Sequence, residues 1–250
     1  MRHNPHPDKF ADRPVVLIAS GPSMDRDVYP QVDEILERLA KAHSDGRCYV
    51  GTCNDACYLA PYTDMVYAGD RKWIKYHIQA LFDFGAEKHP RPVNVSNGYI
   101  DPDKFEFYDF SQAEFWTKDD GAVEMYPQWQ RVYQEKYTGL CTQWPKIAHG
   151  GNSGHQLINV AYHFGAGKGG PILLLGYDCK NKNSDPKTVK KNHFFGNHPA
   201  GWGNANGVID WRFFFKGISK ALRKRGINIV NCSLDTAIEC FDRGKLEDYL

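Results

Sequence analysis

The stretch Val15–Met24, VVLIASGPSM, begins as an apolar run and ends in small residues around a proline. A short apolar run that stops at such a turn is typical of a buried strand. From Gln31 onward, apolar residues recur at helical spacing, and Pro30 suits the first turn of a helix. The stretch therefore predicts a strand, a turn and a helix, the repeating unit of a parallel α/β sheet.

The remainder of the chain repeats this alternation, which favours one domain over residues 1–250. Further strands are predicted over 47–53, 64–68, 93–96, 172–175 and 227–230, and further helices over 153–164, 208–225 and 233–241. Residues 97–147 are rich in aromatic side chains and lack clear periodicity. We expect this segment to be an insertion in the domain, or a lid over the sheet.

Composition narrows the class of protein. The formal net charge is +1, with 42% hydrophobic and 24% charged residues, so no overall field recruits nucleic acid or a membrane. The segments 180–191 and 216–225 are locally basic. The apolar runs are too short to span a bilayer, and the first residues do not resemble a signal peptide. The 7 cysteines lack paired metal spacing. We expect a cytoplasmic protein with reduced thiols and no metal site.

The end of the first predicted strand is a candidate binding site, because ligands of open α/β sheets lie outside the carboxyl ends of strands. Gly21 would let the backbone approach a ligand closely, and Ser20 and Ser23 offer hydroxyl groups. The exposed N–H groups of such a turn suit an anionic oxygen. The alternative is an ordinary strand-to-helix turn with a serine cap. The stretch lacks both the Walker pattern and a full dinucleotide fingerprint.

Polar residues also follow three other predicted strands. Asn54 can donate and accept in one contact, as ribose and base edges require, while Asp70 and Asp178 can accept from sugar hydroxyls. Each of them alone is equally typical of a turn. Their positions at strand ends predict that they share one edge of the sheet, since the carboxyl ends of parallel strands lie together.

A glycine-rich loop, Gly150–Gly154, leads into the helix predicted from residue 153. Free N–H groups and the positive end of the helix dipole would make Asn152, Ser153 and Gly154 a suitable environment for a diphosphate. The alternative is a flexible turn with an Asn or Ser cap.

Two histidines, His193 and His198, lie in the long polar segment 180–207. Histidine titrates near neutral pH, so either residue could take a proton from an attacking hydroxyl. No third ligand of matched spacing accompanies them, which argues against a metal site built on the pair.

Taken in order, these motifs resemble those of a known superfamily. It joins the family 42 bacterial sialyltransferases with the DUF115, or 6-hydroxymethylpterin diphosphokinase-like, proteins and includes short stand-alone members in bacteriophages. The resemblance covers residues 14–70 and 150–241, and it rests on Ser20–Ser23, Cys53–Asn54, Gly150–Gly154, Leu175–Asp178, His193–Gly196 and the late strand INIVNCS.

The resemblance implies a Rossmann-like α/β fold, with a mostly parallel sheet, helices on both faces and a bound nucleotide-activated donor. It places one group of residues at the phosphates and a second group beside them, with Asn54 at the nucleotide. A metal is not essential in the sialyltransferases. The phosphate group comprises Ser20, Gly21 and Ser23, and the neighbouring group comprises Asn152, Ser153 and Gly154.

The chain departs from the family pattern at two catalytic positions. The family's general base lies in a His-aromatic-aliphatic-Gly-His run, whereas residues 193–198 read HFFGNH, one residue out of register. The base is then His198 after a one-residue shift, or His193, or is absent. The family's phosphate-binding tyrosine corresponds to Lys180, which can neutralise phosphate charge but cannot replace a phenol. The resemblance therefore leaves the donor sugar open.

These observations favour a glycosyltransferase-like enzyme that moves a sugar from a nucleotide-activated donor to an acceptor hydroxyl. Loop N–H groups and Lys180 would stabilise the leaving phosphate, without a required cofactor. The acceptor is not specified, and the basic segments keep nucleic acid among the alternatives. A second reading is diphosphate transfer from a nucleoside triphosphate, with Mg²⁺ held by Asp70 and Asp178. A third is a nucleotide-binding module that has lost its catalytic base.

Overall fold

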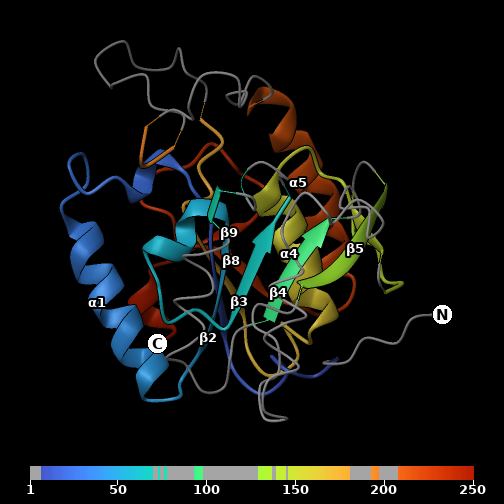
Figure 1. Cartoon of the computed structure of the whole chain (residues 1–250), viewed down its shortest axis with the longest axis horizontal. Coiled ribbons are helices and arrows are strands. Elements are labelled where there is room, and N and C mark those ends of the chain that lie inside the picture. The colour runs from blue at the N-terminus through green and yellow to red at the C-terminus, as the bar shows by residue number, and fades with distance from the viewer. Residues whose placement is uncertain are drawn as a thin grey trace.

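The structure, a computed structural model, describes residues 7–69, 73, 76–77, 93–97, 129–136, 139–144, 146–180, 193–196 and 208–250. Its centre is a 9-stranded sheet with the strand order β6-β5-β4-β3-β2-β1-β7-β8-β9 (Figure 1). The strands are β1 (Val15–Ile18), β2 (Tyr49–Cys53), β3 (Met65–Ala68), β4 (Val93–Asn97), β5 (Trp129–Lys136), β6 (Lys146–Ala148), β7 (Ile172–Leu175), β8 (Ile229–Asn231) and β9 (Asp242–Arg243).

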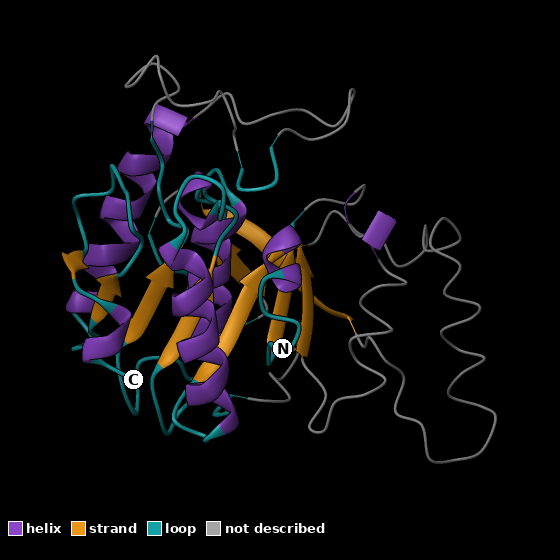
Figure 2. Cartoon of the chain, turned by 90° about the vertical axis from the view of Figure 1, so that its left-hand side faces the viewer, coloured by secondary structure: helices purple, strands orange, loops and turns teal. Residues whose placement is uncertain are grey.

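Each pair of neighbouring strands in this sheet is parallel, so the carboxyl ends of the strands share one edge (Figure 2). β1 lies at the centre, where Val15 is in register with Tyr49 of β2 and with Ile172 of β7. The sheet grows from β1 to β6 on one side and from β7 to β9 on the other. This reversal between β1 and β7 is the topological switch point of a Rossmann-like fold.

Helices cover both faces of the sheet, because the central strands are apolar on both sides. Leu17 and Leu174 pack with the buried side of α4 (Ser153–His163) and of α5 (Val208–Arg223). Val16 and Ile18 pack on the other face with residues of α1 (Gln31–Ser44), which lies across the sheet from α4 and α5 (Figure 1). The α/β fold with a parallel sheet and helices on both faces is therefore confirmed.

The predicted helix over 233–241 is wrong. Residues 232–241 carry no helix and instead bond to the loop that follows β7. The Ser233 hydroxyl accepts from the Tyr177 N–H at 2.8 Å, and the Thr236 hydroxyl donates to the Tyr177 carbonyl at 2.6 Å. Serine and threonine side chains that bond to backbone in this way compete with helix formation. The segment continues into β9 and a short 3-10 helix, Leu246–Asp248.

The expected insertion over 97–147 contributes in part to the sheet itself. β5 pairs with β4, and β6 pairs with β5, so the last part of this interval extends the sheet on the β4 side. Residues 98–128 lie outside the described residues, and the lid and the single domain remain predictions. In the part of the chain that the structure describes, no helix is both long and apolar enough to span a bilayer.

Candidate functional site

The junction between β1 and β7 is closed by contacts within the protein. The Gly21 N–H donates to the Gly176 carbonyl at 3.0 Å. A Cβ atom on Gly21 would lie 2.3 Å from that carbonyl oxygen and 2.6 Å from Cγ of Asp178. Glycine is therefore required here by the approach of two loops, a different reason from the ligand approach expected for Gly21.

Ser23 and Asp178 seal the same junction. Both residues are buried, and the Ser23 N–H and hydroxyl donate to the two carboxylate oxygens of Asp178 at 2.6 and 2.5 Å. Burial raises the pKa of Asp178 to about 7, although these two hydrogen bonds oppose the shift. Ser23 and Asp178 therefore bond to each other in this structure, whereas we expected a phosphate contact for Ser23 and a sugar contact for Asp178.

The adjacent junction, between the end of β2 and the start of α4, is not sealed in this way. Asn54, the first residue of the 3-10 helix η2 (Asn54–Tyr58), has a φ of 49°, in the left-handed region that asparagine tolerates. Its Nδ2 donates to Oγ of Ser153 at 3.3 Å. Its buried Oδ1 has no hydrogen-bond partner among the described residues. An unpaired buried acceptor is costly, and a donor on a ligand would remove that cost.

Ser20 lies beside this junction at the end of β1. Its hydroxyl donates to the carbonyl of Cys53, the residue before Asn54, at 3.4 Å. The ends of β1 and β2 and the start of α4 are thereby linked by side chains, so the structure brings Ser20, Asn54 and Ser153 together as predicted for a shared strand edge.

The start of α4 has N–H groups in its first turn without acceptors from the described part of the protein. Asn152 caps the helix, because its Oδ1 accepts from the His155 N–H at 2.9 Å. No acceptor within the described residues bonds to the N–H groups of Ser153 or Gly154. The helix dipole adds positive potential at this end. The carbonyl of Gly154 accepts from the Tyr177 hydroxyl at 3.1 Å, which fixes α4 on the end of β7.

The histidine segment lies against the end of β1. The Phe194 N–H donates to the Ser20 carbonyl at 3.2 Å, and His193 and Gly196 pair through backbone hydrogen bonds of 3.1 and 2.9 Å. The His193 ring stacks on Phe195 with 5.0 Å between ring centroids. The segment that carries His193 is therefore held at the end of β1.

Three other predicted site residues have different outcomes. Lys180 forms an ion pair with Asp235, which also accepts from the Tyr29 hydroxyl at 3.0 Å. Lys180 is therefore engaged by a carboxylate of the protein, in contrast to the phosphate contact expected for it. His198 and Asp70 lie outside the described residues.

Sequence reasoning missed a cluster that begins one residue after Asn54. Asp55 accepts from Trp73 Nε1 at 2.8 Å and lies 3.7 Å from His77 Nε2. His77 Nδ1 is 2.5 Å from the hydroxyl of Tyr58, and the His77 ring stacks on Trp73. Burial raises the pKa of Tyr58 to about 12, which favours the phenol as hydrogen-bond donor. Asp55 follows a predicted strand end, but no spacing in the sequence points to His77.

The cysteines are structural thiols. All 7 are free, and Cys48, Cys53, Cys57, Cys141 and Cys232 are buried. Burial raises the pKa of Cys53 to about 12, so the thiol beside Asn54 stays protonated and unreactive near neutral pH. Within the described ranges, no group of three or more metal-ligating side chains gathers in one place.

Comparison with known proteins found no matching family model, no similar curated protein and no similar solved structure. The likeness to the sialyltransferase and DUF115 superfamily therefore remains a prediction from the motifs.

Proposed function

We propose that the protein binds a nucleotide-activated sugar at the junction of β2 and α4 and transfers the sugar to an acceptor hydroxyl. The observation that carries this proposal is the unpaired, buried Oδ1 of Asn54 next to Ser153 at the start of α4. Both lie at the carboxyl edge of a parallel sheet, the edge at which this class of fold binds its ligands. They are one strand away from the switch point.

The polar groups of this junction are complementary to those of a nucleotide. Asn54 Oδ1 needs a donor, and a ribose hydroxyl or an amino group of a base supplies one. The first-turn N–H groups of α4 need acceptors, and phosphate oxygens supply them. The same N–H groups would stabilise the charge that develops on the leaving phosphate during transfer.

The acceptor hydroxyl must lose a proton, and among the described histidines His193 is the one that the motif resemblance assigns to this role. The segment that carries His193 is held at the end of β1, because the Phe194 N–H donates to the Ser20 carbonyl. His77 is a weaker candidate, since Asp55 lies at one of its ring nitrogens and the Tyr58 hydroxyl at the other, which leaves neither nitrogen free to take a proton. Loss of turnover with retained donor binding in His193→Ala would identify His193 as the base.

Diphosphate transfer from a nucleoside triphosphate is the alternative reaction. It would require Mg²⁺ held by Asp70 and Asp178. Both carboxylate oxygens of Asp178 accept from Ser23, so a metal at Asp178 would compete with two buried hydrogen bonds. This competition favours sugar transfer as the first reaction to test.

A thermal-shift screen tests the proposal directly. CMP, UDP, GDP and ATP are each added at 1 mM, roughly one hundred times a 10 μM dissociation constant, with and without Mg²⁺, and binding at that strength adds about 2.7 kcal/mol of stability. Without Mg²⁺, we expect CMP, UDP or GDP, the nucleotides that sugar donors carry, to stabilise the chain. Stabilisation by ATP alone, and only with Mg²⁺, would favour diphosphate transfer.

Two variants locate the site. Asn54→Gly keeps the left-handed backbone while removing the unpaired acceptor, and it should abolish the nucleotide-dependent shift. Asn228→Gly is the matched control, because Asn228 is exposed and precedes β8 at the opposite edge of the sheet. The proposal is wrong if no nucleotide stabilises the wild-type chain, or if Asn54→Gly and Asn228→Gly show the same nucleotide-dependent shift.

A further inference from the structure

The solvent side of α5 carries a row of lysines. Lys216, Lys220 and Lys224 are exposed and follow one another at four-residue spacing, which places them along one face over about 12 Å. Among the described residues, no carboxylate forms an ion pair with any of the three ammonium groups. The row is therefore a local concentration of uncompensated positive charge on a chain whose net charge is only +1.

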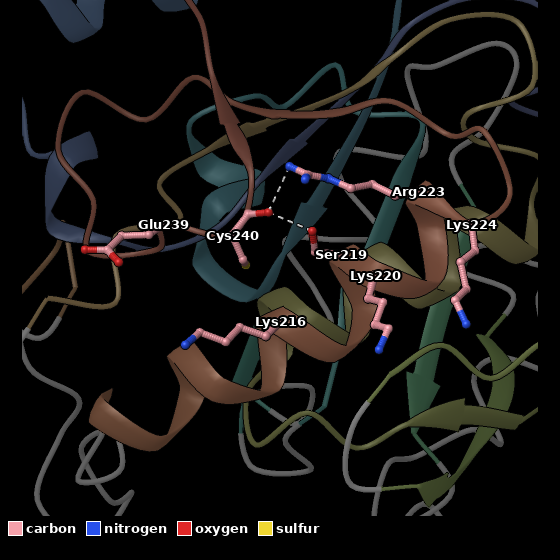
Figure 3. Close-up of a pocket in the computed structure, with 7 residues that line it drawn as sticks. All are labelled: Lys216, Ser219, Lys220, Arg223, Lys224, Glu239 and Cys240. Atoms are coloured by element: carbon pink, nitrogen blue, oxygen red, sulfur yellow. Dashed lines mark hydrogen bonds between the residues drawn. The ribbon is translucent and has the colours of Figure 1, made fainter.

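A hollow of about 670 Å³ lies along this row, between α5 and the segment that leads to β9 (Figure 3). The wall of the hollow is fixed by the protein itself. Ser219 Oγ donates to the Cys240 carbonyl at 2.7 Å, and Arg223 bonds to the same carbonyl at 3.3 Å and to Asp242 at 2.9 Å. Glu239 is the carboxylate in the lining. Arg223 is thus structural, while the lysines point out beside the hollow.

An aromatic side chain continues the row at its N-terminal end. Phe213 is 59% exposed, and the ammonium group of Lys216 lies 5.2 Å from the centre of its ring. Phe213 precedes Lys216 by three residues and Lys220 by seven, so these three share one side of the helix. A large exposed aromatic ring beside lysines is the combination used to stack a base while holding its phosphates.

The opposite side of α5 is not available to a partner. Phe215, Ile218 and Leu222 are almost completely buried against the sheet. An amphipathic helix that binds a membrane inserts its apolar face, and here that face forms part of the core. The charge and the single exposed ring therefore favour a flexible polyanion over a lipid surface.

We propose that this face of α5, defined by Phe213, Lys216, Lys220 and Lys224, binds single-stranded nucleic acid. The backbone phosphates lie along the lysines, and an unpaired base stacks on Phe213. The lysines of this surface lie away from the proposed nucleotide site, because α5 runs toward β8 and brings Lys220, and Lys224 just after its end, to the amino edge of the sheet. Phe213 lies nearer the other end of α5, beside Trp211 and Phe214, which approach Gly151. Its test therefore stands whether or not the transfer reaction is correct.

Fluorescence anisotropy with labelled oligo-dT and oligo-U of 20 nucleotides tests the inference in 50 to 200 mM salt. Three phosphate contacts on a single strand predict that log K falls with log salt at a slope of roughly −2. In the triple variant Lys216→Gln, Lys220→Gln, Lys224→Gln, we expect at least a tenfold loss of affinity at 50 mM salt and most of this slope to disappear. Phe213→Ala should weaken binding by at least about fivefold.

The matched control is Lys41→Gln, Lys168→Gln, Lys245→Gln, which removes the same charge from other exposed sites. It should bind like the wild-type chain, and all variants should melt together, since every altered side chain is exposed. The inference is overturned if the wild-type chain does not bind the oligonucleotides at 50 mM salt, or if the control variant loses as much affinity as the triple variant. It is also overturned if Phe213→Ala binds with wild-type affinity, or if the chain binds anionic vesicles but not the oligonucleotides.

Discussion

Two neighbouring junctions at the carboxyl edge of the sheet satisfy their polar groups in different ways. Between β1 and β7, Gly21, Ser23 and Asp178 bond to one another or to backbone, and the junction is filled. Between β2 and α4, Asn54 retains a buried acceptor without a partner. The contrast shows that the switch point is filled by the protein's own contacts, while a buried acceptor without a partner among the described residues lies one strand away.

Gly21→Ala should show the largest effect, because it forces apart the sealed junction. The new Cβ would lie 2.3 Å from the Gly176 carbonyl oxygen, closer than packed atoms can approach. Overpacking of this kind costs about 3 kcal/mol of unfolding free energy, measured by urea denaturation. Ser20→Ala is the adjacent control and should cost about 1 kcal/mol or less, since it removes one long hydrogen bond of 3.4 Å. Equal effects of the two changes would contradict the close approach of the loops.

The burial of Asp178 should make stability depend on pH, because burial raises the pKa of this carboxyl while the hydrogen bonds from Ser23 oppose the shift. The pKa of Asp178 is about 7 in the folded state, above the value of about 3.9 in an unfolded chain. The folded state therefore binds this proton more tightly, and its contribution to stability is complete below pH 4 and is lost as the pH rises through 7.

Urea denaturation at pH 5 and pH 6 measures this dependence, with an expected loss of at most about 1.4 kcal/mol over that unit. Asp178→Asn is the control, because it cannot titrate and keeps an acceptor for the Ser23 N–H. Its stability should change less than that of the wild-type chain over the same pH interval. Equal changes in the unfolding free energy of the two proteins between pH 5 and pH 6 would show that Asp178 is ionised in the folded state at both pH values.

Asn54→Gly should have the smallest effect on stability in the absence of ligand. It removes one hydrogen bond of 3.3 Å to Ser153, but it also removes the unpaired buried acceptor, and glycine accepts the φ of 49°. The two effects oppose each other, so the unfolding free energy should stay within about 1 kcal/mol of the wild-type value. A loss of about 3 kcal/mol would mean that Asn54 is part of the packing, like the residues of the sealed junction.

The sequence was sufficient for most of the fold and for the gathering of the candidate residues at one edge of the sheet. Apolar runs that stop at small or polar residues predicted β1, β2, β3 and β7, and their parallel pairing necessarily gathers Ser20, Asn54 and Ser153 at one edge. The helix predicted over 233–241 was wrong because its hydroxyl side chains bond to the loop after β7, a contact between distant segments.

The state of the site residues depended on contacts that spacing does not reveal. Ser23 and Asp178 are 155 residues apart, and nothing in either local pattern predicts that they bond. The same holds for Lys180, which pairs with Asp235, and for His77, which meets Asp55 only in the folded chain. Residue types at strand ends therefore predicted a location, while donor and acceptor pairing decided which of them remain available.

The position of β1 has a consequence for synthesis of the chain. One edge of β1 pairs with β2 early in the sequence, but its other edge pairs with β7, which begins at Ile172. During translation the central strand therefore waits with one edge of unpaired backbone N–H and C=O groups until most of the polypeptide has left the ribosome. Long-range parallel pairing of this kind is slow and exposes the nascent chain to aggregation, so successful production should depend on chaperones and on growth temperature.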